Sequence, residues 1–207
     1  MGEMPRGQGW MNHCAQSRLP TAGLVAIAIV LAHGGTDLAI AQERAPLLDP
    51  RSVAPYVPTP WHVVDRMIEV AEVTKDDVVY DLGSGDGRIL LRAAKERGAR
   101  GVGYEINPSL VEDAREALGA AGVQDRVEIR HQDIFEADLR PATVVTLFLI
   151  TSAHRQLRPK LLEELRPGTR IACYRWEIPD WNPSKTVTVP VSGSAHPIYL
   201  YMVGAHR

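Results

Sequence analysis

The sequence predicts an α/β fold in which a seven-stranded, mostly parallel sheet closes on a C-terminal antiparallel hairpin. Short apolar runs typical of buried parallel strands alternate with segments whose apolar residues recur at helical spacing. The first run leads into three alternating glycines, in the stretch from Asp81 to Gly87. The last two extended segments, 186–191 and 197–203, are separated by a turn at Gly193 and should pair antiparallel. Strands that alternate with helices in this way form a largely parallel sheet.

The first 41 residues have the organisation of a secretory signal peptide. Residues 22–32 form an uninterrupted apolar run, shorter than the roughly 20 residues of a membrane span. Ala39 and Ala41 supply small residues at the −3 and −1 positions of a cleavage site. We therefore expect export to the periplasm, a proline-rich linker at 42–55, and no stable membrane span after cleavage. The alternatives are an uncleaved membrane anchor, an organelle-targeting leader, or a wrongly assigned start codon, which would leave the protein in the cytoplasm.

The composition argues against two classes of partner. The chain of 207 residues has a formal net charge of −2 and no run rich in lysine and arginine. We therefore expect no nucleic-acid partner, because such binding needs a basic surface. The two cysteines, Cys14 and Cys173, have no metal-ligand spacing, and the seven histidines form no H-x-x-x-H pair. We expect neither a disulfide nor a metal ion.

The folded domain is expected at 56–207, starting with a helix at 61–73 whose apolar residues recur at helical spacing. Thr59 is expected to be the N-cap and Pro60 the first helical residue. Residues 74–77 then turn the chain into the first strand, which begins at Val78. The later helices are expected at about 86–96, 108–118 and 153–165, and the later strands at 101–106, 127–130, 142–150, 170–176, 186–191 and 197–203.

The turn after the first strand carries the strongest functional signal. A dinucleotide-binding turn has the pattern G-x-G-x-x-G, and its third glycine would fall at Arg88. Instead Gly83, Gly85 and Gly87 alternate after Asp81, a pattern typical of S-adenosylmethionine-dependent methyltransferases. Glycines let the methionine arm of that cofactor lie against the loop backbone, while Asp81 faces its ammonium and sulfonium charges. The alternative is a tight turn that binds no ligand.

Two further acids follow the second and third strands. Glu105 ends the second strand, where one carboxylate can accept hydrogen bonds from both ribose hydroxyls. Asp133 and Ile134 follow the third strand, where an acid receives the adenine amino group and the next backbone N–H meets a ring nitrogen. The alternatives are a solvated charge for Glu105 and a simple turn acid for Asp133.

Several motifs together resemble a family, the small archaeal broad-specificity protein lysine methyltransferases. The resemblance extends to their mitochondrial relatives, which methylate lysines on the ATP synthase c subunit and the adenine nucleotide translocase. It covers about residues 55–207. It rests on Y-V-P-T-P at 56–60, D-V-V-Y-D-L-G-S-G-D-G-R-I at 77–89, G-V-G-Y-E-I at 101–106, A-T-V-V-T-L-F-L at 142–149 and W-N-P at 181–183.

The resemblance implies S-adenosyl-L-methionine as the cofactor and a protein partner that presents lysine side chains. By position, it implies that the cofactor is held by Thr59, Pro60, Asp81, Gly83, Ser84, Gly85, Glu105, Ile106, Asp133 and Ile134. Thr59 and Pro60 would close over the cofactor.

The acceptor channel is expected beside the cofactor, at the carboxyl ends of the fourth and fifth strands. Its candidates are Thr151, Trp176, Glu177 and Trp181. An apolar, aromatic channel favours the neutral lysine amine by desolvation, so we expect no single indispensable base. The alternatives are tryptophans that only pack, a small-molecule O- or N-methyltransferase, and a non-catalytic exported domain that kept the fold.

Overall fold

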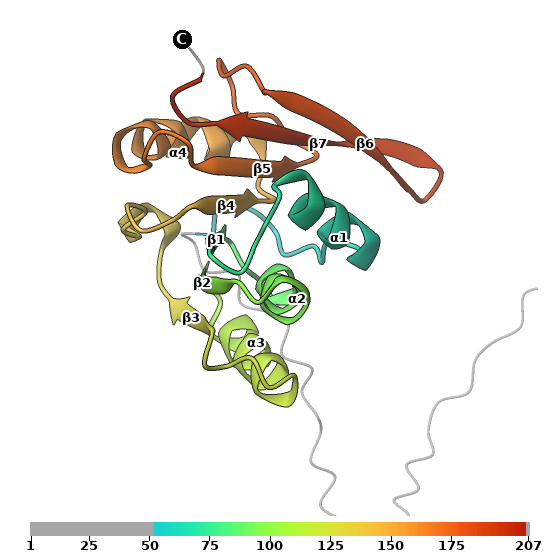
Figure 1. Cartoon of the computed structure of the whole chain (residues 1–207), viewed down its shortest axis with the longest axis vertical. Coiled ribbons are helices and arrows are strands. Elements are labelled where there is room, and N and C mark those ends of the chain that lie inside the picture. Colours follow the sequence, from blue (N-terminus) through green and yellow to red (C-terminus); the bar gives the residue numbers. More distant parts are fainter. Residues whose placement is uncertain (1–51, 206–207) are drawn as a thin grey trace, which may run out of the picture. The chain divides into compact units, whose positions relative to one another are not determined.

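The computed structural model describes residues 52–205, which form a sheet with helices on both faces (Figure 1). The helices are α1 (Trp61–Val70), α2 (Arg88–Arg97), α3 (Pro108–Ala120) and α4 (Thr151–Glu164), with a short 3-10 helix at Ile134–Glu136. The strands are β1 (Val78–Leu82), β2 (Arg100–Glu105), β3 (Val127–His131), β4 (Val144–Leu147), β5 (Arg170–Tyr174), β6 (Lys185–Val191) and β7 (Ser194–Met202). The predicted signal peptide and most of the predicted linker lie outside the described residues.

The strand order is β3-β2-β1-β4-β5-β7-β6 in one seven-stranded sheet. β1 pairs in parallel with β2 and β4, β2 with β3, and β4 with β5. β7 runs antiparallel to both β5 and β6. The predicted fold class is therefore confirmed, including the C-terminal hairpin.

Two apolar cores lie on the two faces of the sheet. The helices α1, α2 and α3 cover one face, where residues such as Met67, Leu90 and Val111 share one apolar core with Val79 and Val144. On the other face, α4 contributes Ala153, Leu157 and Leu161 to a second core. All four residues of β4 are buried, as expected for a central parallel strand covered on both faces.

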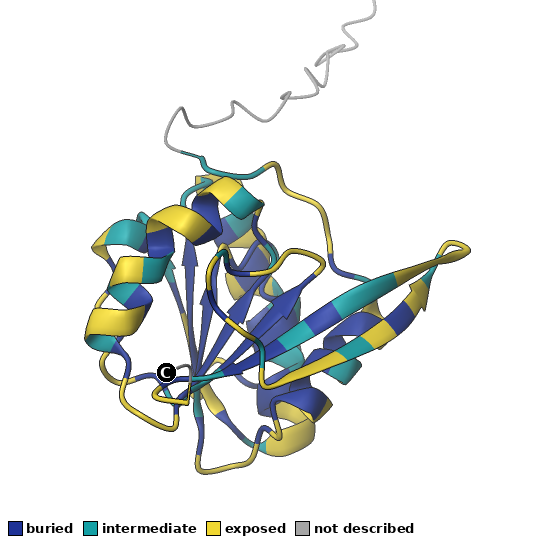
Figure 2. Ribbon diagram, turned by 90° about the horizontal axis from the view of Figure 1, so that it is seen from above, coloured by how far each residue is buried: buried dark blue, intermediate teal, exposed yellow. Residues whose placement is uncertain are grey.

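The hairpin of β6 and β7 projects beyond the other strands, and much of β6 is exposed (Figure 2). Its turn contains Ser192 and Gly193, both with positive φ. In the part of the chain that the structure describes, no helix is long and apolar enough to cross a membrane.

Two local predictions were wrong. The apolar run at 142–150 was expected to be one strand, but β4 spans only Val144–Leu147, because the chain leaves the sheet after Leu147 to reach the start of α4 at Thr151. Thr59 was expected to cap α1, but Pro60 is the N-cap residue and no side chain caps this helix. The Pro60 carbonyl accepts the first helical hydrogen bonds, from Val63 at 2.9 Å and Val64 at 3.0 Å.

Candidate active site

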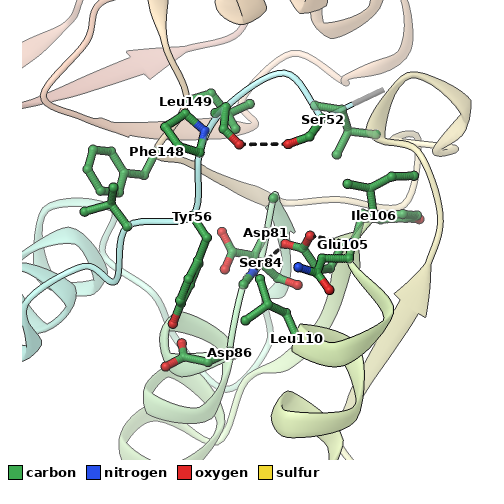
Figure 3. A pocket seen from close by; sticks show the side chains of 18 of the residues that line it. Ser52, Tyr56, Asp81, Ser84, Asp86, Glu105, Ile106, Leu110, Phe148 and Leu149 are labelled. Carbon is green, nitrogen blue, oxygen red and sulfur yellow. Dashed lines mark hydrogen bonds between the residues drawn. The ribbon is translucent and has the colours of Figure 1, made fainter. Parts of the chain in front are cut away.

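A cleft opens at the carboxyl edge of the sheet, where β1, β2 and β4 end (Figure 3). One wall is the glycine loop between β1 and α2, and another is the segment 52–59, which precedes α1. All the predicted cofactor-binding residues except Pro60 line this cleft: Thr59, Asp81, Gly83, Ser84, Gly85, Glu105, Ile106, Asp133 and Ile134. The structure thus brings together residues from four separate parts of the sequence.

The glycine loop folds sharply because its glycines adopt backbone angles that other residues rarely take. Gly83 and Gly85 have φ values of +84° and +53°, in the left-handed region. The backbone N–H groups of Gly83 and Ser84 both donate to the Tyr104 carbonyl of β2, at 2.9 and 3.0 Å. These bonds fasten the loop to the neighbouring strand and leave its outer face toward the cleft.

Glu105, the last residue of β2, connects the glycine loop with the turn between β2 and α3. One of its carboxylate oxygens accepts from the Gly85 N–H at 2.9 Å, and the other accepts from the Asn107 N–H at 2.8 Å. Each oxygen keeps a second lone pair that can accept from a ligand hydroxyl. Glu105 can therefore hold the loop and a bound ribose at the same time.

Asp81 is the most deeply buried acid of the cleft, with a relative exposure of 2%. Its Oδ1 accepts a hydrogen bond from the Thr146 hydroxyl at 2.7 Å. Burial, together with the nearby Glu105 and Asp86 carboxylates, raises the pKa of Asp81 to about 7, against the opposing effect of the Thr146 hydrogen bond. This carboxylate would be stabilised by a ligand that carries positive charge.

Asp133 follows β3 and caps the short 3-10 helix, since its Oδ1 accepts from the Phe135 N–H at 2.9 Å. Ile134 is buried beside it and also lines the cleft. The cap fixes the direction of the backbone at the point where the sequence analysis expects the adenine ring.

The segment 52–59 crosses the cleft and includes residues that the sequence analysis assigned to the linker. The ring of Tyr56 lies so close to the loop that a Cβ on Gly85 would be 2.6 Å from it. At the end of the segment, the Arg88 guanidinium donates to the Thr59 carbonyl at 2.8 Å and pairs with Asp86. Arg88 thus ties this segment to the glycine loop.

The four acceptor-channel candidates do not line the cleft. Thr151 begins α4, and Trp176 and Glu177 lie exposed in the loop after β5. Trp181 is only 5% exposed and packs on Tyr201, with 5.6 Å between the ring centroids. Trp181 therefore belongs to the core below the loop.

Several residues of the cleft were not found by sequence reasoning. Phe148 and Leu149 line it after β4 although they were assigned to a buried strand. Tyr56 and Arg88 also line it, although they were noted only as parts of motifs. Thr146, which contacts Asp81 from β4, was noted only as part of an apolar run. The proline-rich motif before α1 was the one sequence signal for the segment 52–59 that crosses the cleft.

The residues of the cleft fit S-adenosylmethionine. The Ser84 hydroxyl is buried in its wall and has no hydrogen-bond partner among the described residues, as expected of a group that pairs with a polar ligand. The Asp81 carboxylate forms no ion pair with any residue of 52–205, whereas the cofactor carries an ammonium and a sulfonium charge. Within the same range, no cluster of three histidine, cysteine, aspartate or glutamate side chains could hold a metal ion.

The mostly parallel sheet, the glycine loop after β1 and the acid at the end of β2, together with likeness to a solved methyltransferase that holds S-adenosyl-L-homocysteine, place the chain among Rossmann-like methyltransferases that use S-adenosylmethionine. More specifically, the chain belongs to the family described as the ANTKMT methyltransferase domain, whose model matches residues 81–185.

Known relatives agree with this assignment. A protein-lysine N-methyltransferase of Saccharolobus islandicus is 46% identical over 154 residues, which cover 74% of this chain and 96% of that protein. A lysine N-methyltransferase of Xenopus laevis, named for the ATP synthase c subunit, is 31% identical, with 89% of this chain and 79% of that protein covered. A crystal structure described as an RNA methyltransferase from Salinibacter ruber with S-adenosyl-L-homocysteine has a TM-score of 0.68 and 50% identity. It covers 73% of this chain and 96% of that one.

Proposed function

We propose that this protein transfers the methyl group of S-adenosylmethionine to the ε-amine of lysine side chains in a protein substrate. The observation that carries the proposal is the 46% identity to a protein-lysine N-methyltransferase over nearly the whole length of that enzyme. Relatives named for lysine methylation of the ATP synthase c subunit and of the adenine nucleotide translocase support the same acceptor chemistry.

The bound cofactor supplies a methyl group on a positively charged sulfur, so the protein mainly has to position an amine in line with it. A free lysine has a pKa of about 10.4, and little of it is neutral near pH 7. Apolar surroundings favour the neutral amine by desolvation. Tyr56, Phe148 and Leu149 provide such surroundings at the cleft, and no side-chain base is required.

The ten cofactor-binding residues keep the roles given by the sequence analysis, with Glu105 on the ribose and Asp81 toward the cationic groups. We assign Thr151, Trp176 and Glu177 to the entrance for the acceptor, because they follow β4 and β5 at the edge of the sheet where the cleft opens. Trp181 supports the loop between β5 and β6 from below.

RNA is the second candidate acceptor, because the 50% identical Salinibacter ruber protein is described as an RNA methyltransferase. The net charge of −2 favours a protein acceptor, since RNA binding relies on neutralising phosphates with basic residues. Small-molecule methylation and a fold without catalysis are further outcomes for the same test.

The test is label transfer from methyl-labelled cofactor to an extract of the native host, followed by separate protease and nuclease digestion. We expect label that protease releases, that nuclease leaves in place, and that is recovered as methyl-lysine. The matched control is Glu105→Ala, which should incorporate little label. Nuclease-sensitive label would establish the RNA alternative, and label found only in small molecules would establish small-molecule methylation.

We also propose that the chain is exported and cleaved after Ala41, since residues 22–32 and Ala39 have the pattern of a signal peptide. Intact-mass measurement of the natively produced protein tests this proposal. A mass that lacks residues 1–41 is expected. A mass that includes them would indicate a membrane anchor, and one that starts at an internal methionine would indicate a cytoplasmic protein.

A further inference from the structure

Thr146 is a hydroxyl residue inside an otherwise apolar central strand. It is 1% exposed and lies directly beside Asp81 in the pairing of β1 with β4. Its Oγ1 donates to Asp81 Oδ1 at 2.7 Å. A hydroxyl buried in a strand costs free energy unless it is hydrogen-bonded, so this bond is the reason that a threonine is tolerated here.

The groups around Asp81 explain why this bond matters for binding. The neighbouring strand β2 places the Glu105 carboxylate near it, and the glycine loop places Asp86 near it. Both acids and the burial itself disfavour the charged form of Asp81, whereas the hydroxyl of Thr146 favours it. Arg88 does not offset this repulsion directly, because its guanidinium is engaged by Asp86 and the Thr59 carbonyl.

We propose that Thr146 is a positioning residue of the cofactor site, whose hydroxyl orients the Asp81 carboxylate and stabilises its charged form for a cationic ligand. The proposal rests on the binding of S-adenosylmethionine in this cleft. Thr146 need not touch the ligand, and its effect passes through Asp81. Binding should therefore depend on Thr146 most strongly at the pH values where Asp81 is partly protonated.

The chain offers a matched control at the opposite end of the same strands. The Thr143 hydroxyl donates to Asp77 Oδ1 at 2.7 Å, just before β4 and β1 begin, whereas the cleft lies where these strands end. Substitution to valine removes the hydroxyl–carboxylate bond in both places while keeping the side-chain shape, and in Thr143→Val it also removes the bond that the hydroxyl accepts from the Val78 N–H at 2.9 Å. Only the Thr146 variant should affect binding.

The first measurement is a carbon-13 NMR titration of the Asp81 carboxyl in the full chain without ligand. Thr146→Val should shift its titration to higher pH, and Thr146→Ser should restore it. The second is calorimetry with S-adenosylmethionine. Thr146→Val should weaken binding by about ten- to hundredfold at pH 7, with a smaller loss at pH 9, where Asp81 is ionised in both proteins. Thr143→Val should bind like the wild type.

An unchanged Asp81 titration in Thr146→Val would overturn the proposal, and so would equal losses of affinity in Thr146→Val and Thr146→Ser. The two readouts also separate this proposal from the assigned cofactor. If the wild-type protein did not bind S-adenosylmethionine at all, the functional assignment would fail, while the titration would still report whether Thr146 controls Asp81.

Discussion

The two ends of β1 and β4 contain the same pair of residue types in opposite electrostatic settings. At the amino end, Thr143 donates to Asp77, and Arg170 forms an ion pair with the same carboxylate. At the carboxyl end, Thr146 donates to Asp81, but no described cation pairs with it. The carboxylate at the amino end is therefore paired within the protein, whereas the carboxylate at the other end is left for a cationic ligand to pair with.

The pKa values of the two aspartates follow this difference. Burial raises the pKa of Asp77, but hydrogen bonds from Thr143 and Thr74 and the charge of Arg170 bring it below its ordinary value. Burial raises the pKa of Asp81 to about 7. Asp77 thus adds stability that is lost as the pH falls, whereas ionisation of Asp81 removes stability as the pH rises from about 4 to about 7.

The largest expected effect comes from removing the ion pair at the amino end of β1 and β4. Arg170→Ala should lower the free energy of unfolding by about 3–5 kcal/mol, because it leaves the Asp77 carboxylate buried without its cation. Denaturant unfolding measures this loss, and calorimetry should find unchanged cofactor affinity in the folded protein. Arg140→Ala, which removes an exposed pair with Asp138, is the control and should change stability little. A loss of cofactor affinity in Arg170→Ala would show that the two ends are not independent.

The next expected effect is a gain in stability rather than a loss. Asp81→Asn should raise the free energy of unfolding at pH 8 by about 1–4 kcal/mol, because the buried charge is removed. The gain should shrink as the pH falls from 7 toward 4 and vanish below 4, where the wild-type carboxyl is protonated in both states. Unfolding curves over this pH range provide the measurement. A gain that does not depend on pH would mean that Asp81 is not the titrating group.

At the ligand side of the cleft, Glu105→Ala should cost about 1.5–3 kcal/mol of binding free energy, about ten- to more than hundredfold in affinity. The reason is the loss of the proposed ribose contacts together with the hydrogen bonds from the Gly85 and Asn107 N–H groups. Glu105→Gln keeps an acceptor and should lose less. Calorimetry that finds equal affinity in wild type and Glu105→Ala would remove the ribose assignment.

The last expected effect is a pH dependence of the methyl transfer and concerns the acceptor. Between pH 7 and 9, the rate of transfer to a labelled protein substrate should rise about tenfold per pH unit, because the neutral lysine fraction rises by that factor. Asp81→Asn, assayed at saturating cofactor, should keep the same slope. A profile that falls above pH 8 while the enzyme stays folded would argue for an essential acid and against the lysine assignment.

Sequence reasoning found the parts of the site that depend on local structure. The turn at Gly83 and Gly85 and the acid at Glu105 follow strands directly, so their position at the sheet edge could be predicted. The bond between Asp81 and Thr146 could not, because it depends on the register of two strands 65 residues apart.

The acceptor-channel residues stay a prediction, and their surroundings could not be derived from the sequence for a similar reason. Trp181 is an aromatic residue of the kind expected in an acceptor channel, but tertiary packing against Tyr201 buries its side chain. Residues 52–55 of the segment that crosses the cleft were interpreted as part of a linker because prolines exclude regular structure, although prolines also suit a fixed extended segment. Which face such a segment covers is set by contacts such as that of Arg88 with the Thr59 carbonyl, and these have no local sequence signal.

The most direct test of whether a cationic ligand completes the carboxyl end is proton release on binding. Calorimetric titration of the wild-type protein with S-adenosylmethionine at pH 7, repeated in buffers of different ionisation enthalpy, measures the protons exchanged. Because Asp81 is partly protonated before binding and faces a cation afterwards, we expect release of a fraction of a proton, which Asp81→Asn abolishes. Equal proton exchange by the wild type and Asp81→Asn, or none by either, would contradict this role of Asp81.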